Sequence, residues 1–432
     1  MTSKNKIIER KTCRISGEKL VPIFSLGNLY MSDFIKKKSN PKLGRVPLNL
    51  CLAPKSGLVQ LSHTPPFDEM YRKYWYRSGT NKTMTEELRN IADSATKLIK
   101  PQKGDVWVDI ASNDGTLLSF VDKNIYKVGF DPSDIAKKEG SKKLNYFVNN
   151  YFNIEDYKKG PRGRDKAKVV TSIAMFYDLE NPHEFVKEVK EVLEDDGLWV
   201  AQMSYLPLML EQLAFDNICH EHLEYYSLTS LKYLLDQHGL EIVDTELNDI
   251  NGGSFRVYIM KNEADKTKFA SAPYRDVANF RIMSILNYEK KLKLNSVETY
   301  KKFFKKISGL REKTVDFIKK EKAKGKIIWG YGASTKGNTL LQWYGLNNDL
   351  IDGIAERSPA KYGLKTAGTN IPIESEEKMR KAKPDYLLVL PWHFISEFVE
   401  REKDFLRSGG KFILPCPNFE VISFNENKKN GS

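Results

Sequence analysis

Apolar and polar positions alternate regularly between strand-like and helix-like segments from residue 105 onward. Short, almost wholly apolar runs predict buried strands at 106–110, 128–131, 167–172 and 197–203. Helical stretches separate these runs, for example from Pro182 to Leu193. Strands that alternate with helices predict βαβ units on a mostly parallel sheet. Two further apolar segments, 240–244 and 254–259, predict an antiparallel pair that closes this sheet.

The alternation restarts nearer the C-terminus, after a basic, proline-free region at 284–324 that predicts a long helical stretch. Strand-like runs follow at 326–330, 350–354, 386–390 and 411–414. They predict a second α/β domain, so the expected fold class is α/β. Earlier in the chain, apolar residues at helical spacing predict a helix over 84–99, and the residues from about 10 to 80 predict short strands and turns.

Composition narrows the class of protein. A length of 432 residues is long for one core, so two or three domains are expected. No run approaches about 18 apolar residues and the first residues lack the apolar core of a signal peptide, so the expected location is cytoplasmic. The net charge of +13 lies largely in lysine-rich helical stretches, and no nucleic-acid-binding motif accompanies it. We expect neither nucleic acid nor membrane as a partner, whereas a phosphate-bearing metabolite suits the charge.

A polar turn at 109–115 follows the first of the buried strands. Such a turn brings the backbone close to a nucleoside ligand, and Asp131, at the end of the next strand, is expected to accept hydrogen bonds from ribose hydroxyls. No Gly-x-Gly-x-x-Gly sequence is present here, which argues against a dehydrogenase; an α/β domain without a cofactor is the other alternative. The candidate cofactor-binding residues are Asp109, Ala111, Asn113, Asp114, Gly115, Asp131 and Ser172.

A dense cluster of ionisable side chains lies at 217–227, which holds two of the 6 histidines together with two glutamates and two tyrosines. A histidine can act as a general base, and the adjacent Glu221 is expected to raise the pKa of an imidazole toward working pH. The spacing of His220 and His222 argues against a metal site, because no His-Glu-x-x-His pattern is present. A satisfied polar network without a catalytic role is the alternative.

A third candidate segment, 330–338, follows a predicted strand and precedes a helical run. Backbone amides at the start of a helix bind anions, and Ser334, Thr335 and Lys336 add donors and charge. The residue order is not that of a Walker loop. The segment therefore predicts a phosphate or diphosphate site, with a tight turn kept from an ancestral nucleotide-binding fold as the alternative.

These three segments, together with several shorter ones, resemble the three-domain sugar C-methyltransferases, which methylate a carbon next to the keto group of a nucleotide-linked deoxysugar. The shorter segments are 25–28, 56–61, 74–81, 251–256, 356–359, 371–373 and 390–392. The resemblance spans nearly the whole chain. It implies a small, mostly β N-terminal domain over 1–80, a class I methyltransferase Rossmann-like domain over 81–265, a helical linker over 266–325 and a second Rossmann-like domain over 326–424.

The resemblance also implies roles for particular residues. S-adenosylmethionine would bind the middle domain, and the nucleotide-sugar would lie between that domain and the C-terminal one. His222 would remove the carbon-bound proton beside Glu221 and His220, and a hydroxyl of Tyr74 or Tyr76 would lie near the sugar. The other candidate substrate contacts are Asn251, Ser254, Arg256, Ser334, Thr335, Lys336, Asn338 and Arg357. The protein is expected to be a monomer or a homodimer.

Two departures from the family pattern limit what the resemblance implies. Members usually hold zinc in the N-terminal domain with two Cys-x-x-Cys pairs, but here Cys13 is followed by Ser16, and the second pair falls on Ala53 and Ser56. We therefore expect a domain without metal, because four thiolates cannot assemble. Cys219 stands where some members carry a tyrosine near the keto oxygen, and a thiol is a poor donor. O-methylation of a related acceptor and a non-catalytic nucleotide- or glycan-binding module are the alternatives.

Overall fold

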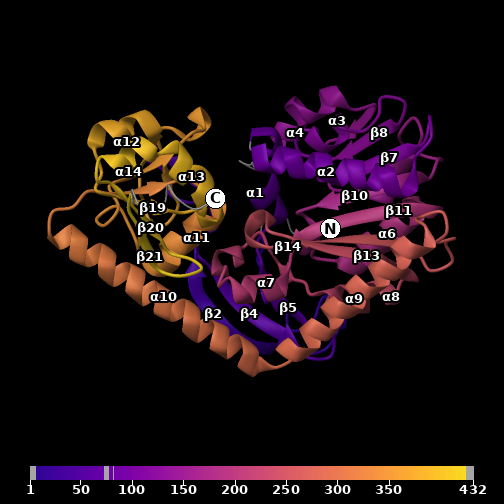
Figure 1. Ribbon diagram of the computed structural model, residues 1–432, viewed down its shortest axis with the longest axis horizontal. Helices are drawn as coiled ribbons and strands as arrows, with labels where there is room; N and C mark the ends of the chain where they lie inside the picture. The colour runs from indigo at the N-terminus through magenta and orange to yellow at the C-terminus, as the bar shows by residue number, and fades with distance from the viewer. Residues whose placement is uncertain (1–5, 73–76, 81, 425–432) are drawn as a thin grey trace. The chain divides into compact units, whose positions relative to one another are not determined.

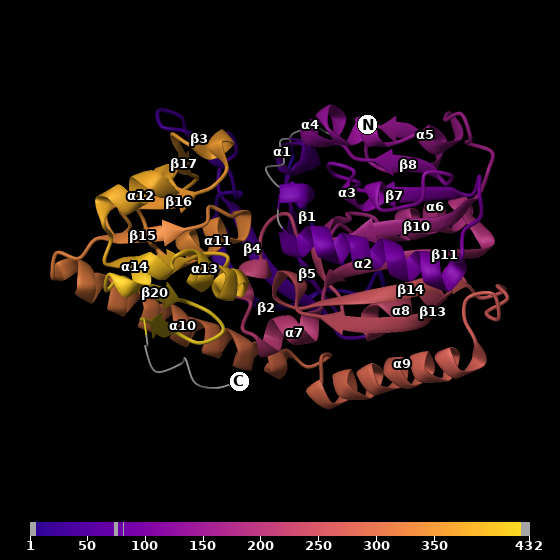
Figure 2. The same cartoon turned by 45° about the horizontal axis from the view of Figure 1, so that its top comes forward.

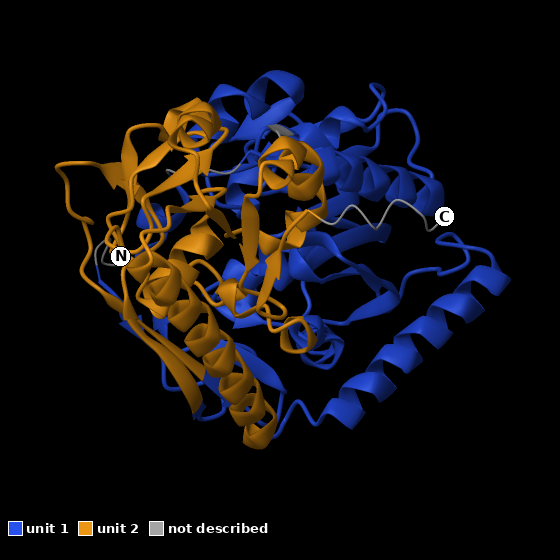
Figure 3. Cartoon of the chain, turned by 60° about the vertical axis from the view of Figure 1, so that its left-hand side comes forward, with its two compact units in different colours: residues 1–22, 51–208, 223–296 blue, residues 23–50, 209–222, 297–432 orange. Residues whose placement is uncertain are grey.

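The computed structural model describes residues 6–72, 77–80 and 82–424. The chain divides into two compact units (Figure 3). Unit 1 comprises residues 1–22, 51–208 and 223–296, and unit 2 comprises residues 23–50, 209–222 and 297–432. Strands β2 (Val21–Leu29) and β4 (Val46–Ala53) and helix α7 (Leu206–Glu211) contain residues of both units. The three domains and the helical linker expected from the sequence stay a prediction.

Unit 1 is built on a seven-stranded sheet (Figure 1) with the order β13-β14-β11-β10-β7-β8-β9. Its strands are β7 (Val106–Ile110), β8 (Tyr126–Phe130), β9 (Tyr146–Val148), β10 (Ala167–Ile173), β11 (Leu193–Ser204), β13 (Leu240–Asn248) and β14 (Ser254–Lys261). Neighbours from β9 to β11 run parallel, while β14 is antiparallel to both β11 and β13. This confirms the predicted parallel sheet with its antiparallel pair.

Helices cover both faces of this sheet, because successive side chains of a strand point to opposite sides. Helices α2 (Lys82–Ile99) and α3 (Thr116–Ser119) lie on one face (Figure 2), and their apolar residues pack with Trp107. On the other face, Val106 and Val108 belong to the core formed with α6 (Pro182–Val192) and α8 (Leu228–Asp236). The sequence therefore predicted α2 and α6 correctly to within two residues.

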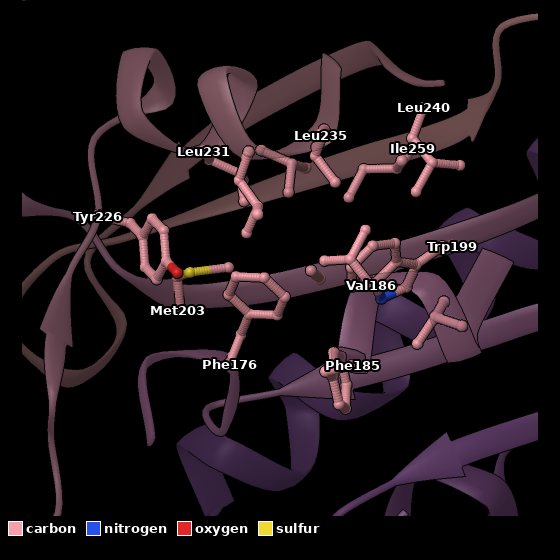
Figure 4. Packing of buried hydrophobic residues seen from close by; sticks show 14 of the residues in the cluster. Phe176, Phe185, Val186, Trp199, Met203, Tyr226, Leu231, Leu235, Leu240 and Ile259 are labelled. Atoms are coloured by element: carbon pink, nitrogen blue, oxygen red, sulfur yellow. The ribbon is translucent and has the colours of Figure 1, made fainter. Parts of the chain in front are cut away.

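The second of these cores contains a group of aromatic side chains. Figure 4 shows Leu231 and Leu235 on the α8 side, facing Phe176 and Trp199. The ring of Phe176 lies 5.7 Å from that of Trp199 and 5.2 Å from that of Tyr226. Large buried aromatic rings contribute strongly to core stability. The sheet beneath the turn at 109–115 is thus a rigid support for that turn.

The remaining elements of unit 1 are short, apart from one long helix. The strands are β1 (Ile8–Glu9), β5 (Leu58–Leu61), β6 (His63–Thr64) and β12 (Glu224–Tyr225). The helical elements are α1 (Phe67–Tyr71), η1 (Ser78–Thr80), α4 (Asp134–Lys138), η2 (Gly140–Lys143), α5 (Ile154–Lys158), η3 (Phe176–Asp178), η5 (Ile250–Gly252) and α9 (Ala272–Leu292). β1 pairs with β6 and β12 with β5, both antiparallel.

Unit 2 contains a six-stranded sheet with the order β18-β16-β15-β19-β20-β21. Its strands are β15 (Ile328–Tyr331), β16 (Gly353–Glu356), β18 (Ile373–Ser375), β19 (Tyr386–Val389), β20 (Lys411–Leu414) and β21 (Glu420–Ile422). All pairs are parallel except β20 with β21. In chain order this is the arrangement 3-2-1-4-5-6 of dinucleotide-binding folds, which confirms a second Rossmann-like sheet.

The helices of unit 2 include one long helix and several short ones. They are η4 (Phe215–Asn217), α10 (Val297–Ala323), α11 (Thr335–Tyr344), η6 (Pro359–Lys361), α12 (Glu376–Ala382), η7 (Trp392–Phe394), α13 (Ile395–Arg401) and α14 (Lys403–Arg407). A separate antiparallel pair joins β3 (Phe34–Lys36) to β17 (Leu364–Thr366).

The long helical stretch expected at 284–324 proves to be two helices, α9 and α10. Helix α9 ends at Leu292 because Lys293 adopts a left-handed conformation with φ of 55°, which stops helix propagation. No helix of the described part of the chain is both long and apolar enough to cross a membrane.

Candidate functional site

The turn after β7 has an unusual backbone. Ala111, Asn113 and Gly115 have φ angles of 61°, 48° and 73°, all in the left-handed region. Glycine and asparagine adopt this region readily, whereas an alanine is strained by its Cβ. The turn lies at the carboxyl end of β7, which is paired with β8 on one side and β10 on the other. Such a switch point is where open α/β sheets bind ligands.

Asp131 joins this turn to the one that follows β8. Its Oδ2 accepts a hydrogen bond of 2.9 Å from the amide of Asn113, and its Oδ1 accepts one of 2.8 Å from the amide of Ser133. Burial raises the pKa of Asp131, and the bonds from Ser133 and Asn113 oppose that rise. A carboxylate offers about four lone-pair sites, so it can accept ribose hydroxyls in addition to these amides.

Asp109 is tied into the sheet just below the turn. The Thr171 hydroxyl donates a hydrogen bond of 2.6 Å to Asp109 Oδ1. Burial raises the pKa of Asp109 to about 7, against the effect of this hydrogen bond and with the charge of Asp131 adding to the rise. Both forms of the Asp109 carboxyl are therefore populated near neutral pH.

Asp114 connects the turn to the segment before α2. Its Oδ1 accepts from the Thr116 hydroxyl at 2.7 Å, and its Oδ2 accepts from the amide of Gly79 at 2.9 Å. A Cβ added to Gly79 would lie 2.8 Å from both Asp114 Oδ2 and Thr116 Oγ1, so a side chain there would force these two groups to move. The amide of Ser78 donates in the same way to Asn113 Oδ1, at 3.1 Å. The sequence reasoning did not single out Gly79 or Thr116, although Gly79 belongs to the segment 74–81.

The turn also contains a buried hydroxyl without a hydrogen-bond partner among the described residues. This hydroxyl belongs to Ser112, which is 5% exposed. A buried hydroxyl of this kind is costly unless water or a ligand satisfies it. A sharply turned backbone whose Asn113 amide donates to Asp131 fits a nucleoside with its ribose. Tyr74 and Tyr76, two other candidates, lie outside the described residues.

The other candidate residues of unit 1 already form hydrogen bonds within the protein. The Ser172 hydroxyl accepts from Trp199 Nε1 at 2.9 Å. The Arg256 guanidinium is buried and donates to Glu87 at 2.8 Å and to Gln202 at 2.9 Å. The hydroxyl of Ser254 donates to Ile250 O at 2.9 Å, beside Asn251 in the turn between β13 and β14. Their roles in ligand binding stay predictions.

The strain at Ala111 leads to a prediction. Ala111→Gly should stabilise unit 1 by up to about 1 kcal/mol, because release of the left-handed penalty exceeds the entropy that glycine loses on folding. Urea unfolding followed by tryptophan fluorescence would measure the change. Ala92→Gly, in the middle of α2, is a matched control and should destabilise the same unit. A lower unfolding midpoint for Ala111→Gly would contradict the assignment of strain.

In unit 2, the histidine cluster lies in a turn that follows η4. Phe215 anchors this turn on α11, where its ring lies 4.8 Å from that of Trp343 and 5.4 Å from that of Tyr344. The His222 Nδ1 lies 2.9 Å from the backbone oxygen of Asn217. A carbonyl oxygen can only accept, so Nδ1 carries the hydrogen and the lone pair of the neutral ring is on Nε2.

The electrostatic surroundings of His222 differ from those expected. Burial lowers the pKa of His222 to about 3, and the positive charge of Lys336 adds to the effect. The expectation that Glu221 would raise the pKa of the base was therefore wrong. Burial raises the pKa of Glu221 itself to about 7, so it does not supply a full negative charge at neutral pH. His222 is accordingly neutral, as a base must be before it accepts a proton.

His220 points into the unit. Its Nε2 donates to the backbone oxygen of Val46 at 3.0 Å, and the residue is 1% exposed. Burial lowers its pKa to about 4, against the hydrogen bond to Val46. These contacts support a packing role for His220, and its catalytic role stays a prediction.

The pKa of His220 predicts a pH dependence of stability. Between pH 6.5 and about 4 the unfolded chain binds a proton at this ring that the folded chain does not, so the free energy of unfolding falls as pH falls. The limiting slope for one proton is about 1.4 kcal/mol per pH unit. His220→Gln should make urea-unfolding free energies less pH-dependent in this window; equal slopes for both proteins would contradict the burial of a neutral ring.

Lys336 lies in the first turn of α11 but turns toward the histidine cluster. Its Nζ donates to the side-chain oxygen of Asn217 at 2.6 Å. Burial lowers the pKa of Lys336, and the neighbouring Asp216 opposes that shift. The Asp216 carboxylate in turn accepts from Trp392 Nε1 at 3.2 Å. Burial and the charge of Lys336 also lower the pKa of His393 to about 3.

The candidates named from the sequence did not include four of these residues, Asp216, Asn217, Trp392 and His393, although Trp392 belongs to the segment 390–392. Asn217 begins the segment 217–227, but the sequence did not show that its side-chain amide bonds to Lys336. Trp392 and His393 follow β19, and only the pairing of β19 with β15 brings them to the start of α11.

The other candidate residues at the start of α11 form hydrogen bonds with residues of the same unit. Ser334 caps the helix by accepting from the amide of Gly337 at 2.9 Å. The backbone oxygen of Thr335 accepts from the Ser32 hydroxyl, and the Asn338 amide donates to the backbone oxygen of Asp33. Asn338 Oδ1, by contrast, is buried and has no partner in the described part of the chain. Arg357 lies further away on the surface, with its side chain 62% exposed.

Two similar tight turns lie in the N-terminal region, at 13–16 and 53–56, where the resemblance implies Cys-x-x-Cys pairs. The amide of Gly17 donates to Cys13 O at 3.0 Å, and the amide of Gly57 donates to Ala53 O at 2.8 Å. The Glu18 carboxylate joins the turns: it accepts from the Ser16 hydroxyl and from the amides of Lys55 and Ser56 at 2.8–3.1 Å. The Cys13 sulfur lies 3.5 Å from Ser56 Oγ. Among the residues with described positions, no group of three or more His, Cys, Asp or Glu side chains could hold a metal ion.

Two family models match the chain. Residues 81–245 match a methyltransferase domain, and residues 249–417 match the C-methyltransferase C-terminal domain. A relative along nearly the whole length is the C-methyltransferase NovU of Streptomyces niveus. It is 28% identical over 415 residues, which cover 95% of this chain and 96% of NovU.

Solved methyltransferase structures also align with part of the chain. The plantazolicin methyltransferase BpumL, in complex with SAH, aligns with a TM-score of 0.32 at 13% identity over 40% of this chain and 82% of its own. A methyltransferase from Clostridium acetobutylicum aligns with a TM-score of 0.32 at 11% identity, over 41% and 92%.

Proposed function

This chain belongs to the S-adenosylmethionine-dependent C-methyltransferases related to NovU, and from that premise we propose that it methylates a carbon next to the keto group of a nucleotide-linked sugar. The observation that carries the proposal is the state of His222. Its ring is neutral, its Nδ1 hydrogen is fixed on Asn217, and its remaining lone pair is on Nε2. Methylation at carbon requires a base of this kind, because the carbon must first lose a proton.

In the proposed reaction, His222 Nε2 removes the proton from the carbon next to the ketone. The electron pair of the broken C–H bond forms a carbon–carbon double bond, and the electron pair of the ketone moves to its oxygen. S-adenosylmethionine, when bound, supplies an electrophilic methyl group for this carbon. The imidazolium that results then returns its proton to solvent, which regenerates the base.

The residues of the turn after β7 are proposed to hold the cofactor. Asp131 would accept the ribose hydroxyls, and Ser112 would satisfy its buried hydroxyl on the nucleoside. Asp114 and Gly79 keep the turn closed through their hydrogen bond of 2.9 Å. These residues belong to unit 1, whereas His222 belongs to unit 2 (Figure 3).

The nucleotide part of the substrate is assigned to unit 2. Its strand order is that of dinucleotide-binding folds, and α11 begins at the switch point between β15 and β19. Amides at such a helix start favour a diphosphate. Ser334, Thr335 and Arg357, together with Asn251, Ser254, Arg256, Tyr74 and Tyr76, stay candidate substrate contacts.

The proposal is tested with a panel of nucleoside-diphosphate-linked keto-deoxysugars and methyl-labelled S-adenosylmethionine. We expect one of them to accept the label at a carbon next to the ketone. The same sugar should exchange that carbon-bound hydrogen for solvent deuterium with no cofactor present. Label transfer to oxygen without any exchange would contradict the proposal.

A further inference from the structure

We propose that Lys336 serves the acid–base centre rather than the diphosphate, by stabilising the negative charge that develops on the keto oxygen, and that Asn217 positions both Lys336 and His222. The inference rests on the proposed function, because it needs His222 to act as the base. The inference gives Lys336 a new role. From the sequence, the segment 330–338 was expected to bind phosphate, with Lys336 as one of its contacts.

The geometry points away from the phosphate role. A lysine that serves a helix-start anion site should direct its ammonium toward the first amides of the helix. Here the Lys336 Nζ donates to Asn217 Oδ1 at 2.6 Å, in the turn that carries the histidine cluster. The same Asn217 holds His222 through its backbone oxygen at 2.9 Å. One residue therefore fixes the ammonium through its side chain and the base through its main chain.

Asn217 is itself rigidly held, as a positioning residue must be. It is 2% exposed, and its side-chain nitrogen donates to the backbone oxygen of Ala214 at 3.2 Å. The neighbouring Asp216 is 2% exposed and accepts from Trp392 Nε1. These contacts anchor both sides of the turn, so Lys336 and His222 keep their relative positions.

Charge explains why an ammonium is placed beside a base whose pKa it lowers. Lys336 makes His222 a weaker base, which alone would slow proton removal. When Nε2 takes the proton, however, the C–H pair forms the double bond and the ketone pair moves to oxygen, so a full negative charge appears close to the base. A half-buried ammonium stabilises that charge strongly, because little water screens it. The net effect favours the enolate if Lys336 lies on the oxygen side.

This turn also carries a second, weaker donor. Cys219 lies between Asn217 and His222, and its thiol donates weakly. Lys336 is a stronger donor and reaches the same turn from α11. The two positions are linked electrostatically, since Cys219 is among the groups that oppose the lowering of the Lys336 pKa.

The experiment compares Lys336→Met, Lys336→Arg, Asn217→Ala and His222→Asn in the full-length chain. The first readout is cofactor-free deuterium exchange on the sugar identified above. Lys336→Met should lower the exchange rate about 100-fold or more, and Lys336→Arg should retain part of it. Asn217→Ala should give an intermediate loss, because it frees Lys336 but keeps the backbone bond to His222. Affinity for free thymidine and uridine diphosphates, measured by calorimetry, should not change.

The second readout needs no substrate. In the chain labelled with nitrogen-15 histidine, the His222 resonance is assigned by its loss in His222→Asn. Its pKa should rise toward its usual value in Lys336→Met and stay low in Lys336→Arg. A rise in KM and weaker diphosphate binding with exchange intact would overturn the inference, as would an unchanged His222 pKa in Lys336→Met. If His222→Asn keeps full exchange, or the wild-type chain shows none, the proposed function fails first and the inference falls with it.

Discussion

His222→Asn is expected to lower methyl transfer by roughly 100- to 10,000-fold, the range over which a positioned general base contributes. Asparagine is close in size to the imidazole and can still donate to the backbone oxygen of Asn217, so the turn should keep its shape. It has no lone pair of comparable basicity to accept the carbon-bound proton. The loss should therefore appear in kcat, measured as label transfer from S-adenosylmethionine at saturating sugar.

Two comparisons make this result specific. Binding of S-adenosylhomocysteine by His222→Asn should match that of the wild-type chain, because the cofactor residues belong to unit 1. His63→Asn, a matched change at a partly exposed histidine bonded to Ser62, should leave the rate unaltered. Turnover by His222→Asn within a few-fold of wild type would exclude this ring as the base.

Asp131→Asn is expected to weaken S-adenosylhomocysteine binding by about 10- to 100-fold, since hydrogen bonds to a charged group contribute about 1.5–3 kcal/mol. The substitution removes the charge and replaces one acceptor oxygen by a donor. That donor would then face the amide of Asn113 or of Ser133, each of which now points at a carboxylate oxygen. Isothermal titration calorimetry measures the affinity directly.

Asp122→Asn provides the matched control for Asp131→Asn. Asp122 is exposed and lies before β8, whereas Asp131 follows that strand, so the two carboxylates belong to opposite ends of it. Asp122→Asn should retain full affinity. A comparable loss in both variants, or an unchanged affinity in Asp131→Asn, would refute the ribose assignment.

The sheets could be predicted from the sequence because their strands are buried on both faces. Segments such as 106–110 and 386–390 are apolar at nearly every position, and both proved to be parallel strands. The break between α9 and α10 could not be predicted, because it depends on a left-handed lysine, a residue with no special preference for that conformation. The sequence likewise could not reveal that Gly79 approaches Asp114.

Only one half of the candidate site could be predicted from the sequence. The turn after β7 is local, so its acids and its glycine can be recognised together in the sequence. The electrostatics of His222 are not local: Glu221 is adjacent in sequence, yet burial and the distant Lys336 determine the pKa of the ring. Asn217 could be recognised as a link only once α11 was known to contact η4.

The hydrogen bonds by which Glu18 joins the two N-terminal turns determine what this segment needs in order to close. Where thiolates hold zinc, closure of the turns depends on the supply of that ion and fails when chelators or peroxide reach the sulfurs. A carboxylate that accepts from a hydroxyl and two amides needs only the chain itself. Neither zinc supply nor an oxidant acts directly on the hydrogen bonds that join these two turns, because they contain no thiol.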